Sequence, residues 1–531
     1  MFQYAVMNGT LYDGSGAAPR RANLYVSQGR IARVTEQALP AESTFDASGL
    51  AVCPGFIDIH THSDLSPFGA PGFESYVHQG VTTSICGNCG VSFVPHLPRD
   101  HAPKLEAASR AHFRGGLPKV EATDTAGYLS EVAGRCANNV GMLVGQGTLR
   151  EACMADPKAA CPTPGEMSAM QALLRRELEA GAFGLSMGLI YAPGIYSATE
   201  ELIALARVAA GYGAAVTIHM RSEADGVFEA VREVGRIGRE SGAHVHISHF
   251  KIMSRALWGR AGELLALADA LRGEGVALDF DQYPYLASAT PMSTCLPGWV
   301  RRMTAQEQLD LLADPERYAR AVPEIEADPH FVIGADRMLV TSTCGYEPQW
   351  DGKTLAGIAS ALDASPAEAF RQLMLRTQLS ARGCFFTMHR DDALKIALRR
   401  DVSVVSDSTA VDMLSRGLVG VPHPRACNAF VRFLRLNREL GLMPLEWAIH
   451  KMTGLPASQL DIAGRGLLRE GYRADVAVFD PATVADNGTF ADPGVVAEGV
   501  ARVMLNGEWI WKDGAPTGVT SGMGLRRGRA D

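Results

Sequence analysis

A repeated pattern in the middle of the chain limits the possible folds most strongly. Between about residues 54 and 463, a short apolar run rich in β-branched residues ends in a polar or glycine cluster, and a helix-like stretch follows. This unit occurs eight times, with runs that end at His60 and runs at 81–86, 140–144, 182–186, 215–219, 244–249, 276–280 and 402–407. Eight such units predict a (β/α)₈ barrel of the TIM type.

Two parts of the chain depart from this repeat. The interval between the seventh and eighth runs, about 284–401, is too long for a simple crossover, so we predict an inserted lid or subdomain there. Residues 1–53 and 464–531 carry short strand-like runs, two of them followed by Asn-Gly, which is typical of antiparallel hairpins. We predict one small β-sandwich domain built from both chain ends beside the barrel at 54–463. Residues 521–531 are rich in glycine and arginine, and we expect a frayed tail.

Composition limits the partners and the compartment. The 531 residues carry a net charge of −8 and form no basic stripe, so we expect neither a nucleic-acid nor a membrane partner. No apolar run reaches the roughly 20 residues that a membrane span needs. The N-terminus does not resemble a signal peptide, and the ten cysteines are scattered. We therefore expect reduced thiols in a cytoplasmic protein. The composition does not indicate an oligomeric state.

Metal-binding residue types gather at the carboxyl ends of the apolar runs, where active sites of barrels lie. These residues are His60 and His62 after the first run, Cys86 and Cys89 after the second, His219 after the fifth, His249 after the sixth and Asp407 after the eighth. Because side chains alternate along a strand, His60 and His62 point to the same side. Ends of different strands meet at one rim of a barrel, so we expect this set to converge on one point.

The residue types indicate the metal and the chemistry. Thiolate and imidazole together favour zinc, with one position left for a water whose pKa the metal lowers. A nearby carboxylate such as Asp407 can move a proton from that water to a leaving amine. Other interpretations stay open: Cys86 and Cys89 as a redox pair, and His219 and His249 as hydrogen-bonded core histidines.

Three further groups have modest roles in this interpretation. Asp58 is either a partner that orients a histidine or an acid at a strand end. His244 and His246 are expected to be core or scaffold residues rather than ligands. The segment 279–281, Asp-Phe-Asp, is expected to form a turn rather than a second pair of catalytic acids.

The set of His-x-His, two single histidines and a final aspartate resembles the metal-dependent amidohydrolase superfamily. Within it, the chain looks most like the D-aminoacylases, or N-acyl-D-amino-acid deacylases. The stretches that carry this likeness are Gly-Asn-Cys-Gly at 87–90, Tyr-Ala-Pro-Gly at 191–194, Ser-His-Phe-Lys at 248–251, Tyr-Pro-Tyr at 283–285 and His-Pro-Arg at 423–425. The resemblance spans nearly the whole chain.

The resemblance implies a role for each site residue. It implies that Cys89, His219 and His249 hold one tight Zn²⁺, and that His60 and His62 line a second, weaker position. It makes Asp407 the catalytic acid and base. The residues implied to contact substrate are Lys251, Tyr283 and Arg425 at the carboxylate, Tyr191 in the pocket wall and Ser288 as a further carboxylate contact.

The expected reaction is zinc-dependent hydrolysis of a linear amide, which converts an N-acyl-D-amino acid to a carboxylate and a D-amino acid. The alternatives are an amidohydrolase of cyclic amides, carbamates or D-configured dipeptide-like amides and, more remotely, a non-catalytic assembly protein. The fourth run ends in Ser-Met-Gly at 186–188 and lacks the bridging lysine of hydantoinases. The chain departs from the family pattern at Phe250, Ser408, Cys427 and 286–294, and we expect these changes to lie around the substrate.

Overall fold

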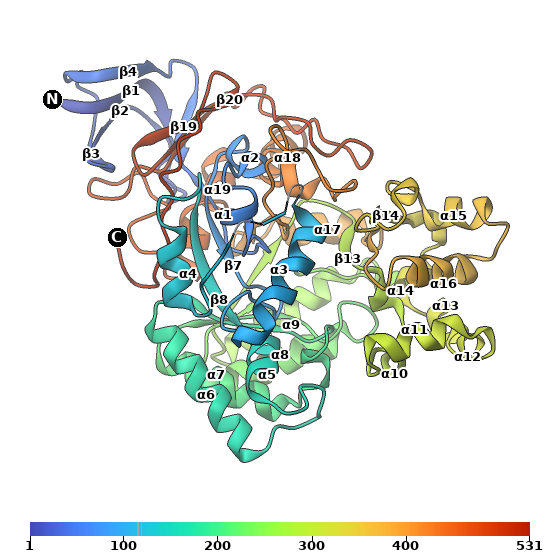
Figure 1. Ribbon diagram of the computed structural model, residues 1–531. Helices are drawn as coiled ribbons and strands as arrows, with labels where there is room; N and C mark the ends of the chain where they lie inside the picture. The colour runs from blue at the N-terminus through green and yellow to red at the C-terminus, as the bar shows by residue number, and fades with distance from the viewer. Residues whose placement is uncertain (114–115, 118, 531) are drawn as a thin grey trace.

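The computed structural model describes residues 1–113, 116–117 and 119–530, and a barrel of parallel strands forms its centre (Figure 1). Eight strands follow the order β16-β12-β11-β10-β9-β8-β7-β6. They are β6 Phe56–Asp58, β7 Val81–Cys86, β8 Asn139–Gly145, β9 Gly184–Gly188, β10 Ala215–His219, β11 Val245–Ile247, β12 Leu278–Gln282 and β16 Val402–Val404. A parallel bridge between Thr61 and Ser408 joins the outer strands just beyond their ends. The predicted (β/α)₈ barrel is confirmed.

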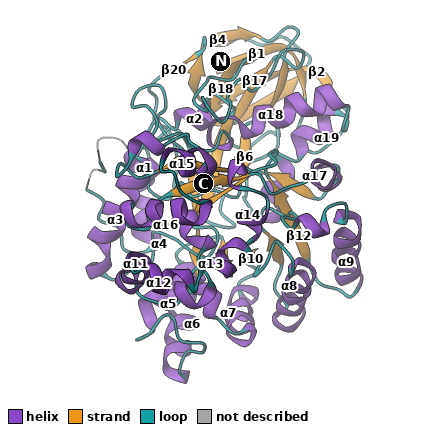
Figure 2. Ribbon diagram, turned by 90° about the vertical axis from the view of Figure 1, so that its right-hand side faces the viewer, coloured by secondary structure: helices purple, strands orange, loops and turns teal. Residues whose placement is uncertain are grey.

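Helices surround the barrel (Figure 2). They are α1 Ser66–Gly69, α2 Glu74–Val77, α3 Pro98–His112, α4 Thr125–Val132, α5 Gln146–Cys153, α6 Pro164–Glu179, α7 Thr199–Gly211, α8 Val227–Ser241, α9 Ala261–Gly273, α17 Arg390–Ala397, α18 Arg425–Leu440, α19 Leu445–His450 and α20 Gly454–Gln459. Local sequence fixes their ends: a capping box of Thr163 and Glu166 begins α6, and Gly242 at φ 73° ends α8. Val227, Val231 and Val234 recur at helical spacing and bury one face of α8.

The predicted insertion lies between β12 and β16, the seventh and eighth barrel strands. It contains an antiparallel three-stranded sheet in the order β13-β15-β14. Its elements are β13 Ser288–Pro291, α10 Gly298–Arg301, α11 Ala305–Ala313, α12 Pro315–Ala319, α13 Val322–Glu326, α14 Pro329–Val332, β14 Met338–Ser342, α15 Leu355–Ala361, α16 Pro366–Arg376 and β15 Arg382–Phe385. A separate apolar cluster that includes Val340, Phe370 and Phe385 forms its core.

Both chain ends contribute to one sheet of nine strands, which Figure 1 shows in blue and red at one side of the barrel. The strands are β1 Phe2–Leu11, β2 Arg20–Ser27, β3 Arg30–Thr35, β4 Ala41–Asp46, β5 Ala51–Pro54, β17 Val476–Phe479, β18 Val500–Leu505, β19 Glu508–Lys512 and β20 Ala515–Pro516. The antiparallel pair β5–β17 joins the two ends of the chain, which confirms the predicted sheet domain. The boundaries at 53/54 and 463/464 stay predictions.

The described part of the C-terminal segment, 521–530, is hydrogen-bonded to the rest of the chain, so the predicted frayed tail is wrong there, and Asp531 lies outside the described residues. A parallel bridge links Gly524 to Val140, and Leu525 N donates to Val140 O at 2.8 Å. Leu525 is 4% exposed and belongs to the apolar cluster that contains Ile57 and Leu143 of the barrel strands. Glycine permits this approach, because a Cβ at Gly524 would lie 2.0 Å from a backbone oxygen. Glycine is common in flexible tails, but in this segment it allows the backbone to pack closely against the barrel.

None of the described helices is both long and apolar enough to cross a membrane.

Leu525→Ala tests whether the C-terminal segment is part of the barrel core. Removing this buried side chain should lower the free energy of unfolding by about 2–4 kcal/mol, measured by denaturant titration. Leu398→Ala is the control, because Leu398 is 48% exposed and its truncation should cost less than about 0.5 kcal/mol. Equal small effects of the two substitutions would contradict the packing described for the tail.

Candidate functional site

A cavity of about 410 Å³ opens at the carboxyl ends of the barrel strands. Its walls come from the loops after those strands and from the inserted subdomain, which contributes Ser288, Thr290 and Arg382 among others. The insertion therefore forms one wall of the site, in agreement with the predicted lid.

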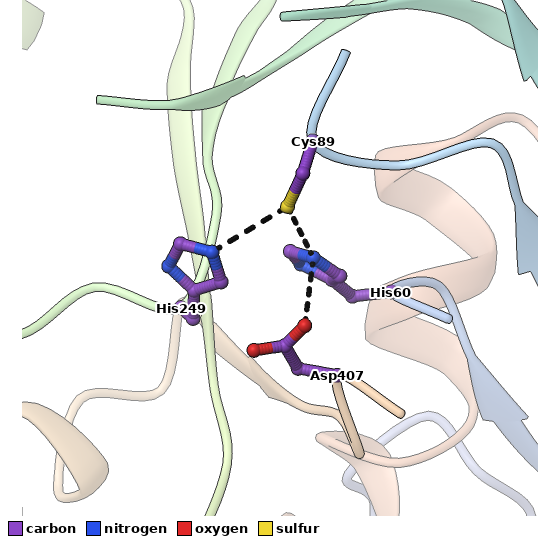
Figure 3. Close-up of side chains that lie close together, drawn as sticks. All are labelled: His60, Cys89, His249 and Asp407. Atoms are coloured by element: carbon purple, nitrogen blue, oxygen red, sulfur yellow. Dashed lines mark hydrogen bonds and ion pairs between the residues drawn. The ribbon is translucent and has the colours of Figure 1, made fainter. Parts of the chain in front are cut away.

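The polar cluster in this cavity includes Cys89, whose sulfur interacts with two histidines (Figure 3). Its Sγ is 3.3 Å from His60 Nε2 and 3.6 Å from His249 Nε2. His60 Nε2 is also 3.5 Å from Asp407 Oδ1. One ligand atom from each of these four residues lies within 4.8 Å of the others, so the arrangement could hold a metal ion.

A second group of possible ligands shares His249 with the first. It consists of His219, Glu223 and His249, again with ligand atoms within 4.8 Å of one another. The rings of His219 and His249 are edge to face, with centroids 4.3 Å apart. Both ring nitrogens of His219 are buried and, among the residues that the structure describes, have no hydrogen-bond partner. Such unpartnered buried nitrogens are costly unless a further ligand satisfies them.

The donor set fits zinc. Burial acts to raise the pKa of the Cys89 thiol, but the neighbouring His60, His219 and His249 outweigh it and hold this pKa well below its usual range. The thiolate is the form that binds metal, and a thiolate with several imidazoles is a typical zinc donor set. The orphaned nitrogens of His219 agree with this assignment. The sequence prediction that these strand-end residues converge therefore agrees with the geometry, while their roles remain proposals.

Three members of the cluster have an unusual backbone conformation. Cys89, His249 and Asp407 have φ values of 53°, 37° and 49°, in the left-handed region that non-glycine residues seldom adopt. Each follows a barrel strand at the point where the chain turns away. Such strain persists where the surrounding structure imposes it, and it aims these three side chains at one another.

Asp281 holds two histidines of the cluster in position, a role that the sequence did not reveal. Its Oδ2 is 3.0 Å from His60 Nδ1 and 2.9 Å from His246 Nε2, and its Oδ1 accepts from the backbone N of His249. Burial acts to raise the pKa of this carboxyl, but His60 and His246 outweigh it and hold the pKa below its ordinary value. The predicted turn at 279–281 is wrong, because these residues lie in β12. His246 acts as scaffold, as expected.

Glu223 is a second residue that sequence reasoning missed. Its Oε1 is 2.8 Å from His249 Nδ1, and it also accepts from Lys251 Nζ. These contacts leave His249 Nε2 directed at Cys89. The sequence does place this acid four residues after His219, but such a spacing is too common to predict a role. A carboxylate behind a ligating imidazole fixes its tautomer and increases its basicity.

The other expected site residues also line the cavity. His62 is more exposed than His60, and its Nε2 is 3.1 Å from Asp407 Oδ1. Asp407 also pairs with Arg425, whose Nη1 is 2.9 Å from Asp407 Oδ2. Burial acts to raise the pKa of Asp407, but Arg425 and His60 hold it well below its usual range.

The five residues expected to contact substrate differ in whether their polar atoms already have a partner in the protein. Tyr283 Oη and Ser288 Oγ are buried and have no partner among the described residues, so both can bind a ligand. Lys251 is already bonded to Glu223 and His249, and Arg425 to Asp407. The Tyr191 hydroxyl lies 3.2 Å from Thr290 Oγ1 of the insertion.

The departures from the family pattern are not all near the substrate. Ser408 lines the cavity. Phe250 instead stacks on Phe280 at 4.8 Å between ring centroids, and Cys427 packs with Val411 and Ala426, so neither is a wall residue. The expectation that these changes surround the substrate is therefore wrong for both, because their side chains point into apolar packing.

Three further residues with expected roles, Asp58, Cys86 and His244, have these partners in the structure. Asp58 accepts from the backbone N of His60 and of Ser406, so it fixes strand ends rather than a histidine ring. Cys86 is a free, buried thiol 3.4 Å from Thr61 Oγ1 and is not paired with Cys89. His244 pairs with Asp279 outside the cluster.

Comparison with known proteins places the chain in a class. Residues 43–292 and 393–510 match the amidohydrolase family, and the gap between them falls within the inserted subdomain. The chain therefore belongs to the amidohydrolase family, whose members hydrolyse carbon–nitrogen bonds other than peptide bonds.

The D-aminoacylases are the group within that family to which it belongs. The chain is 35% identical to a D-aminoacylase of Alcaligenes xylosoxydans xylosoxydans, over 99% of this chain and 98% of that protein. An N-acyl-D-glutamate deacylase of Bordetella bronchiseptica, solved with zinc and a phosphonate mimic of the tetrahedral intermediate, has a TM-score of 0.82 at 36% identity over 99% of both chains. A crystal structure of a D-aminoacylase gives 0.81 at 33% identity, over 99% of this chain and 100% of the other.

Asp281→Asn tests the supporting role of this carboxylate. Loss of its charge should weaken zinc binding about 10- to 100-fold, measured by competition with a chelator, because the His60 ring loses the carboxylate that orients it. Asp279→Asn is the matched control, since Asp279 lies on the same strand and pairs with His244 outside the cluster. Equal zinc affinities in the two variants would contradict the role assigned to Asp281.

Proposed function

We propose that this protein hydrolyses N-acyl-D-amino acids to a carboxylate and a D-amino acid. The observation that carries the proposal is the two groups of possible metal ligands that share His249, one with His60, Cys89 and Asp407 and one with His219 and Glu223, together with unpartnered hydroxyls in the same cavity. Relatives of matching length, named D-aminoacylase, N-acyl-D-glutamate deacylase and N-acyl-D-aspartate deacylase, support the reaction class.

We assign the tight metal position to Cys89, His219 and His249, and a second, weaker position to His60 and His62. A related D-aminoacylase is described as having a binuclear centre, with one-metal activation and second-metal attenuation. That description supports unequal positions. Zinc bound at the tight position would supply a water of lowered pKa and a Lewis acid for the amide carbonyl.

Asp407 carries the proton transfers in this proposal. Its carboxylate lies within hydrogen-bond reach of His62 and beside His60 and Arg425, at the edge of the metal cluster. It accepts the proton of the attacking water and then donates it to the leaving amine. Arg425 holds one carboxylate oxygen, so that the other faces the reacting groups.

The substrate carboxylate is held by groups on one side of the cavity. Tyr283 Oη and Ser288 Oγ are free to donate hydrogen bonds, and Arg425 and Lys251 add positive charge. Fixing the carboxylate and the amide at separate points makes the side chains of the two enantiomers point in different directions, and the named relatives support the D-enantiomer as the one accepted. We also propose a cytoplasmic location, supported by ten free cysteines.

A chiral panel with metal analysis tests the proposed function. The zinc-loaded protein should hydrolyse N-acetyl-D-amino acids and leave the L-enantiomers, hydantoins and dihydroorotate essentially unchanged. Removal of zinc with a chelator should abolish the activity, and added zinc should restore it. Turnover of only the cyclic substrates, or of neither class, would contradict the proposal.

Asp407→Asn tests the proton-transfer role. The substitution should lower kcat about 10²- to 10⁴-fold, because an amide cannot shuttle the proton. Zinc content, measured by atomic absorption, should stay unchanged if Asp407 is not an essential ligand. Asp412→Asn is the control, since Asp412 accepts from the backbone N of Gly72 and lies outside the cavity wall. Full activity of Asp407→Asn would refute the assignment.

A further inference from the structure

The lysines and arginines in the cavity wall outnumber the carboxylates. Among the described wall residues, the lysines and arginines are Lys251, Arg382 and Arg425, and the carboxylates are Glu223 and Asp407. Lys251 pairs with Glu223, and Arg425 pairs with Asp407. Subtracting two matched pairs from three cations leaves Arg382 as the unmatched charge.

Arg382 has no counter-ion within the part of the chain that the structure describes. Its guanidinium makes no hydrogen bond or ion pair with the described residues. The side chain is partly buried at the start of β15, and burial lowers its pKa from the ordinary value. Arginine stays protonated in proteins, so a partly desolvated cation faces the cavity. Burial of an unpaired charge is unfavourable, and an arriving anion would relieve this cost.

The position of Arg382 separates it from Ser288, one of the groups assigned to the substrate α-carboxylate. In the sheet of the insertion, Arg382 lies opposite Pro291, whereas Ser288 lies opposite Phe385. These two levels are three residues apart, which is about 10 Å along a strand. The nearby Arg425 repels Arg382 electrostatically, whereas Asp407, which forms its ion pair with Arg425, attracts Arg382 without pairing with it. We therefore expect Arg382 and Ser288 to contact different parts of the substrate.

We propose that Arg382 binds a second carboxylate of the substrate and makes the enzyme selective for dianionic N-acyl-D-amino acids. The inference rests on the proposed function and deepens it. The side chain of an acidic D-amino acid, aspartate or glutamate, supplies that carboxylate, and a dicarboxylic acyl group is the other source of the same chemistry. Arg382 is a specificity residue, because a guanidinium forms paired hydrogen bonds with a carboxylate.

The similarity to known proteins does not distinguish an acidic substrate from a neutral one. The relatives named D-aminoacylase, N-acyl-D-glutamate deacylase and N-acyl-D-aspartate deacylase are 35%, 36% and 35% identical to this chain. The unmatched arginine in the wall of the cavity favours an acidic substrate over a neutral one.

The test compares acids with their neutral isosteres in the zinc-loaded protein. kcat/KM for N-acetyl-D-glutamate or N-acetyl-D-aspartate should exceed that for N-acetyl-D-glutamine or N-acetyl-D-asparagine by about 10- to 100-fold, as expected for a charged hydrogen-bonded pair. N-succinyl-D-leucine against N-acetyl-D-leucine forms a second arm. A preference in the first arm places the second carboxylate in the side chain, and a preference in the second arm alone places it in the acyl group.

Variants of Arg382 test whether this residue causes the preference for acidic substrates. Arg382→Gln should lower kcat/KM for the preferred acid about 10- to 100-fold and leave the neutral isostere within about 3-fold, because only the acid loses a charged partner. Arg382→Lys should recover part of the preference. Arg320→Gln is the control, since Arg320 is exposed in the same subdomain and should have no effect.

The outcomes separate this inference from the proposed function. Hydrolysis of neutral and acidic N-acyl-D-amino acids at similar rates by the wild-type protein would overturn the inference and leave the proposed function standing. An equal loss for both substrates in Arg382→Gln would also overturn it. Hydrolysis of no N-acyl-D-amino acid would overturn both. The wild-type comparison needs no variant, so it remains decisive even if Arg382→Gln does not fold.

Discussion

The hydrogen bonds that Asp281 accepts inside the barrel fix the geometry on which the cavity depends. This buried carboxylate contacts the rings of His60 and His246 and the backbone of His249. A buried charge is tolerated only where it is fully paired, so the three contacts hold one another in place. Two histidines from different strands, His60 and His249, are thereby directed at Cys89. Preorganisation of this kind is what a metal centre requires of its surroundings.

The barrel and the insertion contribute different residues to the site. The barrel brings the strand ends together and so supplies Cys89, the histidines and Asp407. The insertion closes one side of the cavity with Ser288, Thr290 and Arg382. A wall that excludes water strengthens the electrostatic interactions inside. In this account, the reaction type depends on the barrel, and the choice of substrate depends on a side chain of the insertion.

Much of this arrangement could be predicted from the sequence, because two rules are strong. Eight repeated units predict a barrel, and strand ends in a barrel meet at one rim, which brings His60, Cys89 and Asp407 together. Residues that depend on exact strand limits or on the inserted fold could not be found in this way. Asp281 looked like part of a turn, although it lies inside β12. Arg382 comes from a sheet that the barrel pattern does not describe, and Leu525 packs where glycines allow an approach that composition alone does not reveal.

The central claim is that Cys89 is a ligand of the essential zinc. X-ray absorption spectroscopy at the zinc edge of the active protein tests it most directly. The account predicts one sulfur neighbour at about 2.3 Å together with nitrogen or oxygen neighbours at about 2.0–2.1 Å. The sulfur neighbour should disappear in Cys89→Ala. A fully active protein whose zinc has only nitrogen and oxygen neighbours would contradict the account.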